Sequence, residues 1–222
     1  MAYRWNFGPV WENADVLLKG AFGTLRLFAV CAAVGLLLGL LLGLARQSSK
    51  AWLRGPSAVF VEFFRNTPVL VQILWFYFAL PIVSPVEISP MAAAALGISL
   101  NSAAFTAEIV RGGIVSMDRG QWDAARALGM TAAQAMHRVV LPQALRRMLP
   151  ALTNRGIEIF KMSTLASAVA YVELLQQGKL LASLNFNPIE TYTVIAVIFF
   201  LCLFPLVQAT YWLERRLGRV DA

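Results

Sequence analysis

The stretch Asp123–Pro142 reads DAARALGMTAAQAMHRVVLP, a run of good helix formers that is too polar to lie in lipid. Long apolar segments precede and follow it. Gly129 predicts the end of one short helix, because glycine favours the position just after a helix. Thr131 and Gln134, three residues apart, form the pattern of a capping box that starts a second helix. The stretch therefore predicts a helix–turn–helix element between membrane segments.

Two prolines predict the helix boundaries of this element, and an alanine-rich stripe indicates what it contacts. Pro142 lacks a backbone donor, so it predicts the end of the second helix and the start of a third short one, and Pro150 predicts the start of the next apolar segment. Ala135, Met136 and Val139 form an apolar stripe at helical spacing. A helix resting on a lipid surface prefers Leu, Phe and Trp, so this stripe favours contact with a protein partner.

The composition is that of a polytopic membrane protein. Of the 222 residues, 59% are hydrophobic and only 14% are charged, against about a quarter charged in soluble domains. The net charge of +7 does not indicate nucleic-acid binding, because no basic stripe is interleaved with aromatic residues that stack on bases. Cys31, Cys202 and His137 have neither metal-ligand spacing nor catalytic partners. We therefore expect no metal site and no catalytic residues.

Five segments are long and apolar enough to cross a hydrocarbon core of ~30 Å. They run over about 21–44, 58–80, 91–110, 150–172 and 191–213. The fourth is the most polar and would be missed by a hydropathy plot alone, yet it keeps a broad apolar face. The sequence predicts one all-α transmembrane domain over residues 1–222, with the polar loop 111–149 between the third and fourth spans.

Glycines and prolines predict local features of these spans. Gly35, Gly39 and Gly43 share one face of the first span, where a neighbouring helix can approach closely. The run Gly55–Ser57 predicts a turn and a fresh helix start before the second span. Pro68 predicts a kink within that span.

Basic residues are unevenly distributed over the regions between the spans. In membrane proteins Lys and Arg concentrate in the cytoplasmic loops. Three regions must share one side, and they hold twelve basic residues: Arg46, Lys50, Arg54, Arg111, Arg119, Arg126, Arg138, Arg146, Arg147, Arg215, Arg216 and Arg219. The opposite regions hold Arg4, Lys19 and Lys179. We therefore expect the N-terminus outside, with the loop 111–149 and the C-terminus in the cytoplasm.

The loop residues match a known motif. Their spacing resembles the EAA loop of the permease subunits of ABC importers, which binds the ATPase subunit; the matching residues are Asp123, Ala124, Ala125, Gly129, Leu141 and Pro142. Asp123 stands where glutamate is usual, and Val139 stands where isoleucine is usual. Both departures preserve charge or shape.

Further stretches extend the resemblance over about residues 20–215. VEFFRNTPVLVQ at 61–72, EIVRGGI at 108–114, RGQ at 119–121 and FKMSTL at 160–165 are similar to signatures of the polar amino acid permeases. The chain thus resembles the histidine/glutamine/glutamate-aspartate permease family, and most of all its glutamate/aspartate branch.

The resemblance implies the type I ABC importer fold in a bacterial plasma (inner) membrane. It implies a second permease subunit, identical or different, together with ABC ATPase subunits and an extracytoplasmic amino acid-binding protein. The chain has no Gly-x4-Gly-Lys-Ser/Thr phosphate loop, so we expect ATP and Mg²⁺ to be bound by the ATPase and no cofactor by this chain. Closure of the ATPases would then alternate access to a midplane site.

Polar residues of the second and fourth spans are candidates for lining the substrate path, since polar groups are costly in lipid. They are Arg65, Asn66, Thr67, Glu158, Lys161, Ser163 and Thr164. Each could instead make an interhelical hydrogen bond or ion pair, and Glu158 and Lys161 are spaced to neutralise each other. Many family members carry aspartate where this chain has Met162. The resemblance therefore favours an acidic or neutral amino acid, unless Met162 reflects packing alone.

A transporter or channel powered by an ion gradient is the alternative. Glu62, Glu108 and Glu158 would then act as proton relays. Uptake that needs ATP and an external binding protein supports the importer, whereas uptake that needs only a gradient supports the alternative. No Ser/His/Asp, Cys/His or metal constellation in the sequence supports a membrane enzyme.

Overall fold

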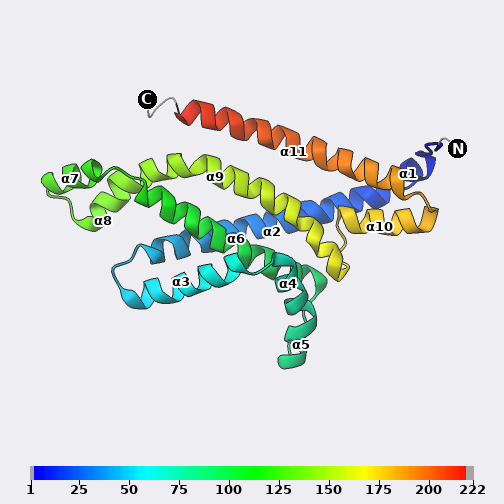
Figure 1. Ribbon diagram of the computed structural model, residues 1–222, viewed down its shortest axis with the longest axis horizontal. Coiled ribbons are helices and arrows are strands. Elements are labelled where there is room, and N and C mark those ends of the chain that lie inside the picture. The colour runs from blue at the N-terminus through cyan, green and yellow to red at the C-terminus, as the bar shows by residue number, and fades with distance from the viewer. Residues whose placement is uncertain (1–2, 219–222) are drawn as a thin grey trace. The chain divides into compact units, whose positions relative to one another are not determined.

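The computed structural model describes residues 3–218, and the regular elements in this range are all helices, with no strand among them. The expected all-α fold is therefore confirmed for this part of the chain (Figure 1). In order, the elements are α1 (Gly8–Glu12), α2 (Ala14–Arg46), α3 (Ala51–Asn66), α4 (Val69–Leu74), the π-helical η1 (Trp75–Ala79), α5 (Leu80–Val83), α6 (Pro90–Val115), α7 (Arg119–Ala127), α8 (Ala132–Ala135), the π-helical η2 (Met136–Val140), α9 (Leu141–Met162), the 3-10 helix η3 (Ser163–Val169), α10 (Leu174–Asn185) and α11 (Pro188–Gly218). Arg219, counted above among the basic residues of the tail, lies outside the described residues.

The chain divides into two compact units, which we describe separately. Unit 1 comprises residues 1–33, 67–99 and 157–207, and unit 2 comprises 34–66, 100–156 and 208–222. In unit 1, α2, α4, α6, α9 and η3 share an apolar core around Leu27, Ile73 and Ile98. In unit 2, the end of α6 packs on η2 and α9 around Val110, Val140 and Met148.

Three of the described helices are long and apolar enough to cross a membrane, namely α2, α6 and α11. α3 and the helical stretch 69–83 pass the same test when they are taken together as one broken span. With this pair, the described residues contain up to four candidate spans. The fourth expected span, about 150–172, which covers part of α9 and all of η3, is not among them. This agrees with the expectation that hydropathy alone would miss it, while the count of five remains a prediction.

The second span is broken, whereas a single kinked helix was expected. α3 ends at Asn66, and the helical stretch 69–83 begins only after Pro68. Pro68 has an extended backbone with ψ 130° and precedes α4, and the side-chain amide of Gln72 donates to Thr67 Oγ1 over 2.6 Å. A proline lacks the backbone donor that would continue the helix and disfavours the helical conformation of the residue before it. The position of the interruption was therefore right, but Pro68 separates two helices instead of bending a single one.

The turn expected at Gly55–Ser57 is wrong, because α3 runs straight through Pro56. The Ser57 hydroxyl donates to the backbone oxygen of Arg54 over 3.2 Å, and Ser57 and Val61 are buried on one face of the helix. Packing of that face outweighs the one hydrogen bond that the proline removes.

The helix boundaries expected at Pro142 and Pro150 are also wrong. The chain stays helical from Ala132 to Met162, with the π-helical η2 directly before α9 and Pro150 inside α9. Pro142 falls in the first turn of α9, where its missing donor costs least. α9 therefore begins well before the expected span.

The polar link expected between the last two spans contains α10. Glu173 caps this helix by accepting the backbone N–H groups of Leu175 and Gln176 over 2.8 and 2.6 Å. The buried residues Leu174, Gly178, Leu181 and Ala182 recur at helical spacing. That spacing was visible in the sequence, but the polar composition of the link concealed it.

The expected glycine face of α2 is observed in unit 2. A Cβ atom added at Gly39 would lie 2.7 Å from Thr106 Cγ2, and one added at Gly43 would lie 2.6 Å from Val110 Cβ. Both contacts are shorter than packed side chains allow. The two glycines therefore form a close seam between α2 and α6.

Candidate functional site

The helix–turn–helix element predicted from the sequence is present in unit 2. Asp118 caps α7 by accepting the backbone N–H of Gly120 over 2.7 Å. Gly129 follows α7 with φ +75°, a backbone conformation that residues other than glycine rarely adopt. Thr131 and Gln134 make both hydrogen bonds of the capping box at the start of α8.

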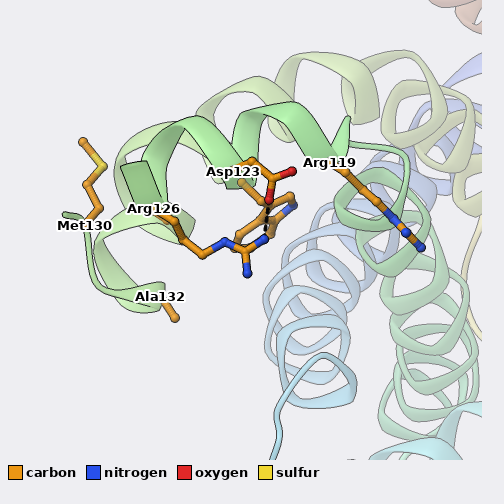
Figure 2. A pocket seen from close by; sticks show the side chains of 7 residues that line it. Arg119, Asp123, Arg126, Met130 and Ala132 are labelled. Carbon is orange, nitrogen blue, oxygen red and sulfur yellow. Dashed lines mark hydrogen bonds and ion pairs between the residues drawn. The ribbon is translucent and has the colours of Figure 1, made fainter. Parts of the chain in front are cut away.

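A groove lies between α7 and α8, with a volume of about 770 Å³. Its lining consists of Arg119, Trp122, Asp123, Arg126, Met130, Ala132 and Ala135. Figure 2 shows the Arg126 side chain reaching along α7 to its ion-pair partner Asp123, with Met130 and Ala132 at the end of the groove away from Arg119. The groove thus combines small and apolar side chains with two arginines and one aspartate.

The helix–turn–helix element that contains the groove is held against the rest of unit 2 by packing and hydrogen bonds. Trp122 and Met136 pack against the core formed by the end of α6 and by α9. Gln143 of α9 donates to Gln121 of α7 over 3.0 Å, and Arg147 donates to the backbone oxygen of Ser116 over 3.0 Å. A force on the groove would therefore reach α6 and α9 directly.

The residues that match the EAA motif have different environments. Asp123 lines the groove, Ala124 and Gly129 are exposed, and Ala125 is buried between the helices. Leu141 and Pro142 lie in the first turn of α9, away from the groove lining. The motif therefore contributes one buried packing residue, Ala125, while Asp123, Ala124, Gly129 and Pro142 remain exposed.

Sequence reasoning missed most of the groove lining, although a signal was present. Arg119, Trp122, Asp123 and Arg126 recur three and four residues apart, which places them on one face of a nine-residue helix. The sequence could not indicate that Met130 and the start of α8 would fold back beside this face.

A second feature of unit 2 is a network of charged side chains around Glu108 of α6. Its carboxylate forms ion pairs with Arg46 of α2, with Arg65 of α3 at 3.6 Å, and with Arg111 at 3.0 Å. Arg46 also approaches Glu62 at 3.9 Å. One carboxylate thereby joins three helices.

Arg155 of α9 forms a neighbouring cluster and is only 4% exposed. Its guanidinium donates to Asn101 Oδ1 over 3.0 Å and lies 4.5 Å from the centre of the Phe105 ring. Asn101 in turn donates to the backbone oxygen of Phe64 over 2.8 Å. Sequence reasoning did not include Arg155 among the site residues, although Asn101 marks a polar position within the apolar α6.

The candidate path residues of the second span already have partners within the chain. Arg65 pairs with Glu108 and lies over the Phe105 ring, and the Asn66 amide donates to the backbone oxygen of Glu62 over 2.8 Å. Thr67 accepts the hydrogen bond from Gln72 described above.

The candidates of the fourth span belong to unit 1. Ser163 and Thr164 donate to the backbone oxygens of Phe160 and Lys161, over 2.7 and 2.8 Å. Glu158 and Lys161 lie on an exposed face of α9. Because Arg65 and Asn66 belong to unit 2, a single path lined by all seven residues remains a prediction.

Curated relatives cover almost the whole chain. The probable amino-acid ABC transporter permease protein YckA of Bacillus subtilis (strain 168) is 38% identical over 197 residues, which are 89% of this chain and 87% of YckA. The glutamine transport system permease protein GlnP of Escherichia coli (strain K12) is 36% identical over 219 residues, which are 98% of this chain and 99% of GlnP.

A solved structure agrees with these relatives. A chain from the crystal structure of an amino acid ABC transporter with histidines is 33% identical and superimposes with a TM-score of 0.90, covering 96% of this chain and 100% of that chain. The agreement shows the type I ABC permease fold. The family model described as "binding-protein-dependent transport system inner membrane component" matches residues 35–219. The chain therefore belongs to this family of multi-pass inner membrane transport components.

Proposed function

We propose that this chain is a permease subunit of an ATP-driven importer for polar amino acids. It forms part of the translocation path, crosses the membrane five times, and has its N-terminus outside and its C-terminus in the cytoplasm. Family membership and the amino-acid and glutamine permeases among its relatives support the substrate class. The excess of basic residues in the loop 111–149 supports the orientation.

The groove between α7 and α8 is the main support for a role of this chain in coupling to the ATPase subunit. It is open to a partner, while Trp122 and Gln121 join it to the core of unit 2. A ridge of an ATPase subunit would fill the groove, and its acidic groups would pair with Arg119 and Arg126. ATP and Mg²⁺ are bound by that subunit, and its closure pulls on α6 and α9 through the groove.

The proposed path is lined by Arg65, Asn66, Thr67, Glu158, Lys161, Ser163 and Thr164. The substrate is glutamate, aspartate or another polar amino acid, delivered by an extracytoplasmic binding protein. A second permease subunit, either another copy or a different chain, completes the enclosure. The exposed Lys161, with Met162 beside it in place of an acid, supports an acidic or neutral substrate over a cationic one.

The gradient-driven alternative is weakened by the environment of Glu108. Three guanidinium groups surround its carboxylate, so releasing it to carry protons would break three ion pairs. A decisive measurement is uptake of labelled glutamate and glutamine into vesicles. Transport should require internal ATP and the binding protein, and transport driven by a gradient alone would refute the importer.

The coupling role is tested by two glycine variants. Neither Gly129 nor Gly112 has a neighbouring atom within 4 Å of an added Cβ, but only Gly129 has a positive φ. Gly129→Val should therefore abolish ATP-coupled uptake while the protein still inserts, and Gly112→Ala should transport normally. Asp123→Lys should also uncouple. Normal uptake with normally stimulated ATPase activity in Gly129→Val and Asp123→Lys would contradict the docking role.

A further inference from the structure

Residues 3–7, which precede α1, form a strap held by a buried carboxylate of α11. Glu190 is 1% exposed and lies in the first turn of α11. Its carboxylate accepts the Tyr3 hydroxyl and the backbone N–H of Asn6, each over 2.8 Å. Val10 of α1 is buried in the same cluster as Leu181 of α10. The strap, α10 and the start of α11 therefore form one end of unit 1 (Figure 1).

This end of unit 1 displays four large aromatic side chains. Tyr3, Trp5, Trp11 and Phe186 are all more than half exposed, and we call them the aromatic cluster. Trp5 packs edge-on against Tyr3 and is stacked on Phe7, with 5.6 Å between ring centres in both pairs. The rings of the strap are thus held in place while their outer faces stay uncovered.

Phe186 adds evidence that the cluster contacts something outside the chain. It connects α10 to α11 with φ 54°, a conformation that is unfavourable for a bulky residue and ordinarily taken by glycine. Its side chain is 91% exposed, so packing within the chain does not compensate for the strain. A phenylalanine at this corner is therefore most readily explained by an external apolar contact.

The adjoining surface indicates what that contact is. Leu18, Phe22 and Leu25 are exposed at helical spacing on α2, and Phe200 and Leu201 are exposed on α11. Both helices are candidate membrane spans. These residues therefore form an exposed apolar surface of unit 1 along two candidate spans, and the aromatic cluster lies at the end where both helices begin.

From this continuity we infer that the aromatic cluster binds the headgroup region of the phospholipid bilayer. Trp and Tyr favour that region because their rings are apolar and their N–H and O–H groups reach water. The exposed Arg4 stands between Tyr3 and Trp5, where its guanidinium can meet lipid phosphates. The strap then holds the start of α11 at a fixed depth through Glu190. This inference does not depend on the substrate or on ATP coupling.

Tryptophan fluorescence of the full chain in phosphatidylcholine vesicles tests the inference. The lipids carry bromine, a quencher, either near the acyl carbonyl or near the chain end. The chain has six tryptophans, so each variant is compared with the wild type. Trp5→Phe and Trp11→Phe should each lose emission that carbonyl-end bromine quenches. Trp122→Phe, in the groove of unit 2, should lose none of it.

A gain-of-signal variant and an aqueous quencher complete the test. Phe186→Trp should add emission that carbonyl-end bromine quenches. The inference fails if Trp5→Phe, Trp11→Phe and Phe186→Trp leave the lipid-quenchable emission unchanged. It also fails if iodide in water, or an added binding protein, alters the emission of these positions and brominated lipid does not.

Discussion

Replacing Gly39 by alanine should destabilise the chain at the close seam between α2 and α6 in unit 2. The added Cβ would lie 2.7 Å from Thr106 Cγ2 and 2.8 Å from the backbone oxygen of Ala103. The backbone oxygen cannot rotate away, so α2 and α6 must separate. Overpacking of this kind costs about 1–3 kcal/mol. Alanine favours the helix over glycine by up to about 1 kcal/mol, which offsets part of that cost.

The matched control is Gly112→Ala in α6, where an added Cβ meets nothing within 4 Å. Both variants gain the same helix propensity, so their difference isolates the contact between α2 and α6. Unfolding in mixed detergent and SDS micelles should show Gly39→Ala to be less stable than Gly112→Ala by about 1–3 kcal/mol. Equal stabilities of the two variants would refute the close seam.

Three further predictions concern charged groups. Burial raises the pKa of Glu173 to about 7, so the folded state holds a proton that the unfolded state releases, and stability should fall as pH rises from about 4.5 to 7. Glu173→Gln should flatten that slope in thermal unfolding, and an unchanged slope would assign it to another group. Glu108→Gln weakens three ion pairs and should lower the unfolding temperature, with a smaller loss at high salt; a loss independent of salt would contradict a mainly electrostatic role. Arg155→Lys keeps the charge but loses the planar contacts to Asn101 and Phe105, so it should cost about 1–3 kcal/mol; wild-type stability would show that the cluster needs only a charge.

The helix–turn–helix element was predictable because its signals are local. The capping box at Thr131 and the turn at Gly129 depend on contacts within a few residues, so the sequence contains them completely. The effects of Pro56 and Pro150 were misjudged because they depend on tertiary packing. Packing of α3 and α9 holds helices through Pro56 and Pro150 that local rules would end.

Composition and local motifs were enough to assign the class of the protein, its polar loop and its family resemblance. These follow from composition and from motifs whose residues are close together in the chain. Glu108 shows the limit of such reasoning, because the sequence offered it as a proton relay. Its partner Arg46 is 62 residues away, and Arg155 meets Asn101 across 54 residues. Only the tertiary structure brings such groups together, because the energy of a buried charge depends on neighbours that the packing of the helices selects.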